Sequence, residues 1–198
     1  MPRPHPTHNI GQLPRRHAAA RPDAPAYLDA DGILTWGELN AKVNSLASRL
    51  ARSMEPGNRL AVVAGNSARY WVVQYAAAKI GAVIVPINHR LLPHEIAAIL
   101  CDVGARALVL DAVRGPGRAG RRAPVETLVL IGGGDPRGIG YDEAVADQSA
   151  PEPPEPTTEL NVIASTSGTS GRPKGAMLTH ESSLVNAGMP VPGRTIRS

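Results

Sequence analysis

One segment of the 198-residue chain combines hydroxyl side chains, glycines and a lysine in a pattern suited to binding a polyphosphate. It spans residues 165–175 and has the sequence STSGTSGRPKG. Gly168 and Gly171 allow backbone conformations closed to other residues, so amide N–H groups can converge on phosphate oxygens. The hydroxyls add side-chain donors, and Lys174 adds a compact positive charge. Nucleotide is therefore the first ligand to consider.

The segment differs from the P-loop of ordinary NTPases. That pattern ends in Gly-Lys-Ser/Thr and opens a helix, whereas here Pro173 precedes the lysine and Gly175 follows it. A proline at this place removes an N–H that a P-loop would direct at phosphate. A plain Gly/Ser/Thr loop without a ligand is the other alternative, and the ordered run of residue types weighs against it.

The elements that must position this segment alternate between helix and strand. Thr35 and Glu38 have capping-box spacing, and a helix is expected from there to Pro56. Apolar residues recur along it at helical intervals: Leu39, Val43, Leu46 and Leu50. Further helices are expected at 68–80, 93–102, 141–146 and 180–187, and strands at 60–64, 82–85, 107–110, 125–131, 160–164 and 176–178.

Such alternation predicts βαβ units, that is, an α/β fold with a mostly parallel sheet and helices on both faces. Residues 151–156 are expected to form an extended, polyproline-like connector into the strand at 160–164. Because strands are expected on both sides of residues 165–175, we predict that this segment lies between strands of one sheet. His180 is expected at the start of the helix that follows.

Residues 165–175 resemble the phosphate-binding signature of the adenylate-forming superfamily, which includes acyl-CoA synthetases, luciferases and peptide-synthetase adenylation domains. The family text Tyr-Thr-Ser-Gly-Thr-Thr-Gly-x-Pro-Lys-Gly differs here only at Ser165 and Ser170. Residues 33–39 are similar to the family's early Leu-Thr-Tyr-x-Glu-Leu element, and residues 79–88 to its second core element. The likeness covers roughly residues 20–188, and the sequence PINHRL from Pro86 is more similar to acyl-CoA synthetases than to peptide-synthetase domains.

The resemblance implies part of the amino-terminal domain of an enzyme that activates a small-molecule carboxylic acid. ATP and Mg²⁺ would give an acyl-adenylate and pyrophosphate, and coenzyme A would then accept the acyl group. Thr166 is the residue expected to contact Mg²⁺, and no catalytic residue is assigned. The residues that the resemblance places at ATP are Thr166, Ser167, Gly168, Thr169, Ser170, Gly171, Pro173, Lys174 and Gly175.

The family's later elements, including its metal-binding acid and catalytic lysine, have no counterpart in this sequence. We therefore expect a partial AMP-binding domain at 21–188, with a flexible tail at 1–20 and an irregular tail at 189–198. Three functions remain open. The chain is part of an acyl-CoA synthetase-like ligase, inactive unless a separate chain completes it; or a non-catalytic nucleotide- or phosphate-binding remnant or module; or an unrelated phosphate-binding α/β protein.

Composition excludes several other classes. The chain is 42% hydrophobic and 19% charged, which is typical of a soluble globular protein. Its net charge of +4 comes largely from arginines in the first 21 residues and at 114–122, where Gly and Pro interrupt any helical face, so no nucleic-acid partner is expected. No apolar run reaches the ~18 residues of a membrane span. Cys101 is alone and is expected to be a small buried hydrophobe in a protein of the reducing cytoplasm.

Overall fold

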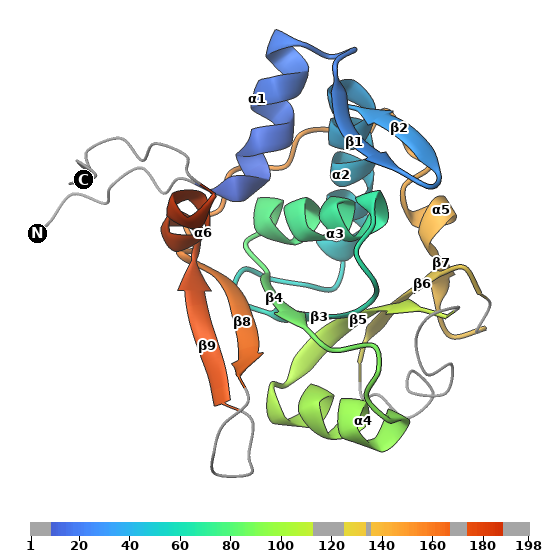
Figure 1. Cartoon of the computed structure of the whole chain (residues 1–198), viewed down its shortest axis with the longest axis vertical. Coiled ribbons are helices and arrows are strands. Elements are labelled where there is room, and N and C mark those ends of the chain that lie inside the picture. The colour runs from blue at the N-terminus through green and yellow to red at the C-terminus, as the bar shows by residue number, and fades with distance from the viewer. Residues whose placement is uncertain (1–8, 113–124, 134–135, 167–173, 188–198) are drawn as a thin grey trace, which may run out of the picture.

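A seven-stranded sheet forms the centre of the computed structural model, which describes residues 9–112, 125–133, 136–166 and 174–187. Every neighbouring pair of strands in it is parallel except the last, which is antiparallel (Figure 1). In sheet order the strands are β7 (Ile139–Gly140), β6 (Thr127–Ile131), β5 (Ala105–Asp111), β3 (Arg59–Val63), β4 (Val83–Pro86), β8 (Leu160–Thr166) and β9 (Lys174–Thr179).

Helices cover both faces of this sheet. α2 (Trp36–Leu50) and α3 (Ala68–Lys79) pack on one face, and α4 (Pro93–Asp102) packs on the other (Figure 1). Successive side chains of β3 alternate between the two cores, because neighbouring residues of a strand point to opposite faces. The structure therefore confirms the predicted α/β class with a mostly parallel sheet.

The capping box of α2 forms as its spacing predicts. The Glu38 N–H donates to Thr35 Oγ1 at 3.3 Å, and the Thr35 N–H donates to a Glu38 carboxylate oxygen at 2.9 Å. The four apolar residues at helical spacing are fully buried against the sheet: Leu39, Val43, Leu46 and Leu50. Local signals were sufficient here because the cap and the apolar stripe both lie within one stretch of sequence.

Part of the predicted flexible tail is ordered structure. Residues 10–20 form η1 (Ile10–Gln12) and α1 (Leu13–Ala20), and only residues 1–8 of that tail lie outside the described residues. The Asn9 side chain donates to the carbonyl oxygen of Ala78 at 2.8 Å, and its Oδ1 accepts from the N–H of Gly11. These contacts anchor the segment to the end of α3, a tertiary effect that the local composition does not contain.

A two-stranded antiparallel sheet was also not expected. It consists of β1 (Pro25–Asp29) and β2 (Gly32–Thr35). The turn signal was present, since Asp-Gly at 31–32 favours a hairpin and Gly32 has a φ of +117°. Two short helices complete the described chain: α5 (Tyr141–Ala144) and α6 (His180–Asn186).

The prediction for Cys101 was wrong. It is a free, exposed thiol near the end of α4, because that helix turns Ile96 and Leu100 toward the sheet instead. None of the helices in the described part of the chain has the length and apolar character that crossing a bilayer requires.

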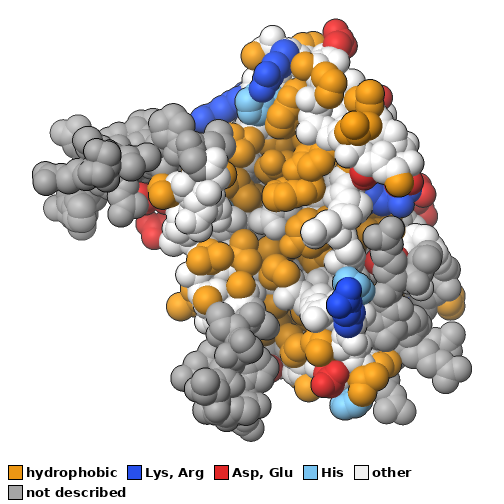
Figure 2. Space-filling model, in the orientation of Figure 1, with side chains coloured by type: hydrophobic (Ala, Val, Ile, Leu, Met, Phe, Trp, Pro, Cys, Tyr) orange, Lys and Arg blue, Asp and Glu red, His pale blue; other side chains and the backbone are white. Residues whose placement is uncertain are grey.

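Apolar side chains also remain at the surface. Figure 2 shows hydrophobic side chains gathered across the middle of the face on which α3 is seen in Figure 1. Five large apolar residues of the described chain are exposed, with Leu28 at 76% and Met177 at 72% the most accessible: Leu28, Ile33, Trp71, Leu92 and Met177. Soluble monomers rarely carry large contiguous patches of this kind.

Candidate functional site

The strands β8 and β9 bring the two ends of the predicted phosphate-binding segment together. They are antiparallel, and in their register Thr166 lies opposite Lys174 and Ser165 lies opposite Gly175. The prediction that the segment lies between strands of one sheet is therefore confirmed. Residues 167–173 lie outside the described residues, so the roles of Ser167, Gly168, Thr169, Ser170, Gly171 and Pro173 stay predictions.

The hairpin also sets where in the sheet this segment begins. β8 is parallel to β4, so Thr166 ends its strand at the carboxyl edge of the parallel sheet. Ligands of open α/β sheets bind outside the carboxyl ends of the strands. A residue with a hydroxyl and a residue with an ammonium group thus stand at paired positions on the edge where a ligand is expected.

Gly175 is required by the packing of the hairpin. A Cβ atom added at this residue would lie 2.7 Å from Cγ2 of Ile163 on β8. A β-branched side chain has little freedom at χ1, so Ile163 could not easily move away. Gly175, which was predicted to bind phosphate, is therefore also needed for the packing of β9 against β8.

The other end of β8 is held by a chain of hydrogen bonds. Asn161 is 2% exposed, and its Oδ1 accepts from Nε2 of Gln74 on α3 at 3.2 Å. Its Nδ2 donates to Oγ of Ser183 on α6 at 2.9 Å. That hydroxyl donates in turn to the carbonyl oxygen of Thr179, the last residue of β9, at 3.0 Å. The chain thus links α3, β8, α6 and β9.

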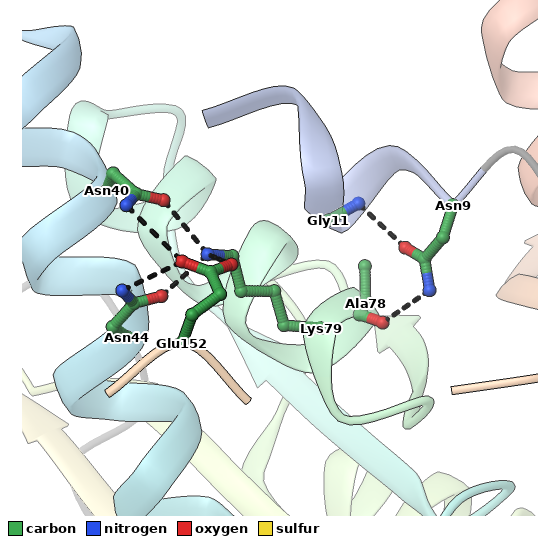
Figure 3. Close-up of polar contacts among 7 residues, drawn as sticks. All are labelled: Asn9, Gly11, Asn40, Asn44, Ala78, Lys79 and Glu152. Carbon is green, nitrogen blue, oxygen red and sulfur yellow. Dashed lines mark hydrogen bonds and ion pairs between the residues drawn. The ribbon is translucent and has the colours of Figure 1, made fainter. Parts of the chain in front are cut away.

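A buried charged cluster lies between α2, α3 and the connector at 151–156, and no sequence pattern indicated it. Lys79, at the end of α3, is fully buried, and its Nζ donates to Oδ1 of Asn40 at 2.9 Å and to Oδ1 of Asn44 at 2.6 Å. Its third donor bond and an ion pair go to Glu152 (Figure 3). The Nδ2 groups of Asn44 and Asn40 approach the other carboxylate oxygen at 3.0 and 3.5 Å.

This cluster uses all the donors of the Lys79 ammonium, so none is left for a ligand. Burial lowers the pKa of Lys79, while the hydrogen bond and charge of Glu152 raise it in partial compensation. Because Glu152 belongs to the connector at 151–156, the cluster fastens that connector to α2 and α3 (Figure 3). No local pattern could predict it, since Glu152 is 73 positions from Lys79.

His180 was expected at the start of a helix, and it is the first residue of α6. Its exposed fraction is 2%. Neither ring nitrogen has a hydrogen-bond partner among the described residues. Burial lowers the pKa of His180 to about 4, so the imidazole is neutral near pH 7. It offers no charge to a phosphate.

Within the described ranges, no group of three or more His, Cys, Asp or Glu side chains could hold a metal ion. Mg²⁺ in nucleotide sites is usually held by one or two carboxylates together with phosphate oxygens. The role expected of Thr166 at Mg²⁺ therefore stays a prediction.

Known proteins are similar to this chain in both sequence and fold. The "AMP-binding enzyme" family model matches residues 14–194. The chain is 36% identical over 185 residues to the long-chain-fatty-acid–CoA ligase FadD13 of Mycobacterium tuberculosis, covering 88% of this chain and 35% of that protein. It is 36% identical over 169 residues to the fatty acid–[acyl-carrier-protein] ligase ScoC of Streptomyces coeruleorubidus, covering 84% and 32%.

Among solved structures, the inhibitor-bound N-terminal domain of FACL13 from Mycobacterium tuberculosis superimposes with a TM-score of 0.71 at 33% identity. The match covers 87% of this chain and 44% of that one. The chain thus spans about a third of the length of the curated relatives it matches. A family model that covers residues 14–194 and a fold shared with a ligase N-terminal domain together show that the chain belongs to the AMP-binding enzyme family.

Proposed function

We propose that the chain is the phosphate-binding part of an ATP-dependent, carboxylate-activating ligase of the acyl-CoA synthetase type. The observation that carries this proposal is the β8–β9 hairpin, which pairs Thr166 with Lys174 at the carboxyl edge of the sheet in a chain of this family. FadD13 and ScoC are both named for ligation of a fatty acid. A carboxylic acid is therefore the substrate we propose, with coenzyme A as the acceptor.

In the proposed site, residues 166–175 hold the β- and γ-phosphates of ATP. The substrate carboxylate attacks the α-phosphate, and negative charge develops on the departing pyrophosphate. Donors that are already aimed at this charge lower the barrier, and the Lys174 ammonium and the hydroxyl of Thr166 are the side chains proposed for it. Bound Mg²⁺ would add Lewis-acid neutralisation of the phosphate charge.

We propose further that turnover requires the remaining two thirds of such a ligase. The relatives are about three times as long as the matched region, and no metal-binding carboxylate cluster lies in the described ranges. The 198 residues should then bind triphosphate without forming acyl-adenylate, with the remaining polypeptide completing the site.

A free and exposed Cys101 is compatible with the reducing cytoplasm, which we propose as the compartment.

A non-catalytic nucleotide- or phosphate-binding remnant or module is the second candidate, and it is favoured by the finding that the described ranges hold no cluster of metal-ligating side chains. Pyrophosphate release that depends on a fatty or aryl acid separates the two candidates. We expect none from the 198 residues alone. The later part of a homologous ligase is then added. Pyrophosphate release that appears with the wild type and not with Lys174→Ala would support the ligase. Phosphate binding without any release would support the module.

Phosphate binding itself is tested by titrating ATP, tripolyphosphate and adenosine, with amide chemical shifts as the readout. Tripolyphosphate should bind and adenosine should not, because charge-assisted hydrogen bonds to phosphate supply the affinity. Lys174→Ala should cost about 1.5–3 kcal/mol of binding free energy, the usual worth of a hydrogen bond to a charged group.

The matched control is Arg172→Ala, which removes a positive charge from the same segment at a position that varies in the family signature. It should cost less than Lys174→Ala. If adenosine shifted the same amides as ATP, or if both alanine variants bound tripolyphosphate as the wild type does, the phosphate assignment of residues 166–175 would be wrong.

A further inference from the structure

Asn161 occupies an irregular place in the hairpin. Leu160 lies opposite Thr179 and Val162 lies opposite Leu178, so β8 has one more residue here than β9. Asn161 is that extra residue, which makes the site a β-bulge. Bulges leave a residue unpaired and redirect its side chain, and they occur often beside functional sites. Here the redirected carboxamide meets Gln74 and Ser183.

The backbone ladder between β8 and its parallel neighbour β4 is short. Between β4 and β8 a single residue pair, Ile84 with Val162, is in register, whereas β3 and β5 share five. Although β4 and β8 run side by side, the backbone ladder that joins the β8–β9 hairpin to the parallel strands is therefore short. A hairpin attached in this way needs other contacts to fix its angle.

The hydrogen-bond chain through Asn161 supplies such contacts next to that ladder. It runs in one donor direction from Gln74 on α3, through Asn161 on β8 and the Ser183 hydroxyl on α6, to the carbonyl oxygen of Thr179 at the end of β9. Gln74 and Asn161 are 6% and 2% exposed, so water competes little for these bonds. The Asn161 carboxamide thus connects β8, which leads into residues 167–173, to α6, which follows β9.

We infer that Asn161 is a positioning residue for phosphate binding: through Gln74 and Ser183 it fixes the angle of the β8–β9 hairpin. The inference rests on the proposed function. Asn161 lies five residues before Thr166, at the far end of β8, so it acts through the strands and does not touch the ligand. Phosphate affinity depends on donors that converge on the same oxygens, and a small rotation of the hairpin would spread them apart.

The test compares two identical chemical changes in different places. Ser183→Ala breaks the chain at α6. Ser45→Ala is the matched control, because the Ser45 hydroxyl likewise joins two elements, donating to the carbonyl oxygen of Ala144 at 3.0 Å and accepting from the N–H of Asp147 at 3.2 Å, away from the hairpin. Asn161→Ala is the direct variant, and Ser183→Thr keeps the hydroxyl. Two quantities are measured: the Kd for tripolyphosphate and the hydrogen exchange of β9 amides relative to β5 amides.

We expect Ser183→Ala and Asn161→Ala to weaken tripolyphosphate binding roughly tenfold, by analogy with the ~10–100-fold loss of affinity when a residue that orients a metal ligand is removed. Exchange should accelerate selectively in β9, and Ser183→Thr should restore both readouts. Ser45→Ala should change neither. A purely structural role would instead lower overall stability, leave the Kd of the folded protein unchanged, and speed exchange equally in β9 and β5.

The two proposals fail in different ways. If the wild type binds no tripolyphosphate, the proposed function is wrong, and the exchange comparison still decides whether the Asn161 chain fixes the hairpin. If Ser183→Ala and Ser45→Ala affect β9 exchange alike, the positioning role of Asn161 is wrong even where tripolyphosphate binds. Should Asn161→Ala fail to fold, Ser183→Ala and Ser183→Thr carry the test.

Discussion

Individual buried polar residues make the stability of this protein depend on pH. His180 is enclosed at the start of α6, and burial lowers its pKa to about 4 from an ordinary value of 6.5. As pH falls below 6.5, the unfolded chain binds a proton at this residue before the folded chain does. Folding stability is therefore retained above pH 6.5 and lost progressively as the pH falls toward 4.

We predict that His180 alone removes about 3 kcal/mol of stability between pH 7.5 and pH 4. Urea unfolding at several pH values measures this loss in the wild type and in His180→Leu, which has no proton to bind. His94→Gln is the control, because His94 is exposed on α4. The pH dependence should shrink in His180→Leu and persist in His94→Gln; an equal dependence in all three proteins would contradict the assignment.

The Lys79–Glu152 pair leads to a different residue-level prediction. Removing one partner of a buried ion pair leaves a charge without its counterion, which costs about 3–5 kcal/mol. The Glu152 side chain is 22% exposed, so we expect the lower end, about 3 kcal/mol, for Lys79→Met. Combining Lys79→Met with Glu152→Gln should recover part of this loss, as a double-mutant cycle in urea would show. Additive losses would mean that the two residues are not coupled.

These residues also show which parts of the site a sequence can predict. Thr166, Lys174 and Gly175 belong to one contiguous pattern, so their types and order suffice to suggest phosphate. Lys79 and Glu152 find each other only in the folded chain, and a lone lysine near a helix end is usually solvated. Asn161 is unpredictable for a further reason, because its role depends on a bulge in the register with β9.

At the scale of elements, the corner between α3 and β4 depends on Gly81. Its φ is +71°, and an added Cβ would lie 2.8 Å from Oγ1 of Thr158 and 2.9 Å from Cβ of Pro156. The connector that leads to β8 therefore packs directly on this glycine. Gly57 is a natural comparison, since its φ is +86° and nothing lies within 4 Å of the same added atom.

We predict that Gly57→Ala costs about 1–2 kcal/mol from backbone strain alone. Gly81→Ala should cost more, because the same strain is joined by a clash with the connector. Thermal or urea unfolding of the two variants measures the difference, which isolates the packing contribution. Equal losses would show that the connector moves away from residue 81 without penalty.

Elements differed in how far the sequence could predict them. The strands at the centre of the sheet and α2 to α4 were predicted because apolar runs and caps mark them locally. α1 was missed because its sequence, LPRRHAAA, has Leu13 as its one large apolar residue; α1 is kept in place by contacts with α2, and η1 by contacts with α3. The β1–β2 hairpin was missed although Asp31 and Gly32 carried a turn signal.

For the molecule as a whole, the apolar surface in Figure 2 favours self-association. β9 is an outer strand of the seven-stranded sheet, and Met177 at its middle is 72% exposed. Edge strands without a central charge readily pair with another chain. We predict concentration-dependent association in sedimentation velocity, reduced by Met177→Lys more than by Ile33→Lys, which lies on the separate two-stranded sheet. A monomer at all concentrations would contradict this.

The strand order has a consequence for how the protein is made. β4 ends at Pro86, but its outer neighbour in the sheet, β8, begins only at Leu160. Lys79 and its partner Glu152 are separated by a similar length of chain, 73 positions. At the usual ~5–20 residues per second, a ribosome needs about 4–15 s to synthesise the intervening chain. During that time β4 lacks its outer neighbour and the Lys79 ammonium lacks its counterion. Unpaired strand edges of this kind make incompletely folded chains prone to aggregation.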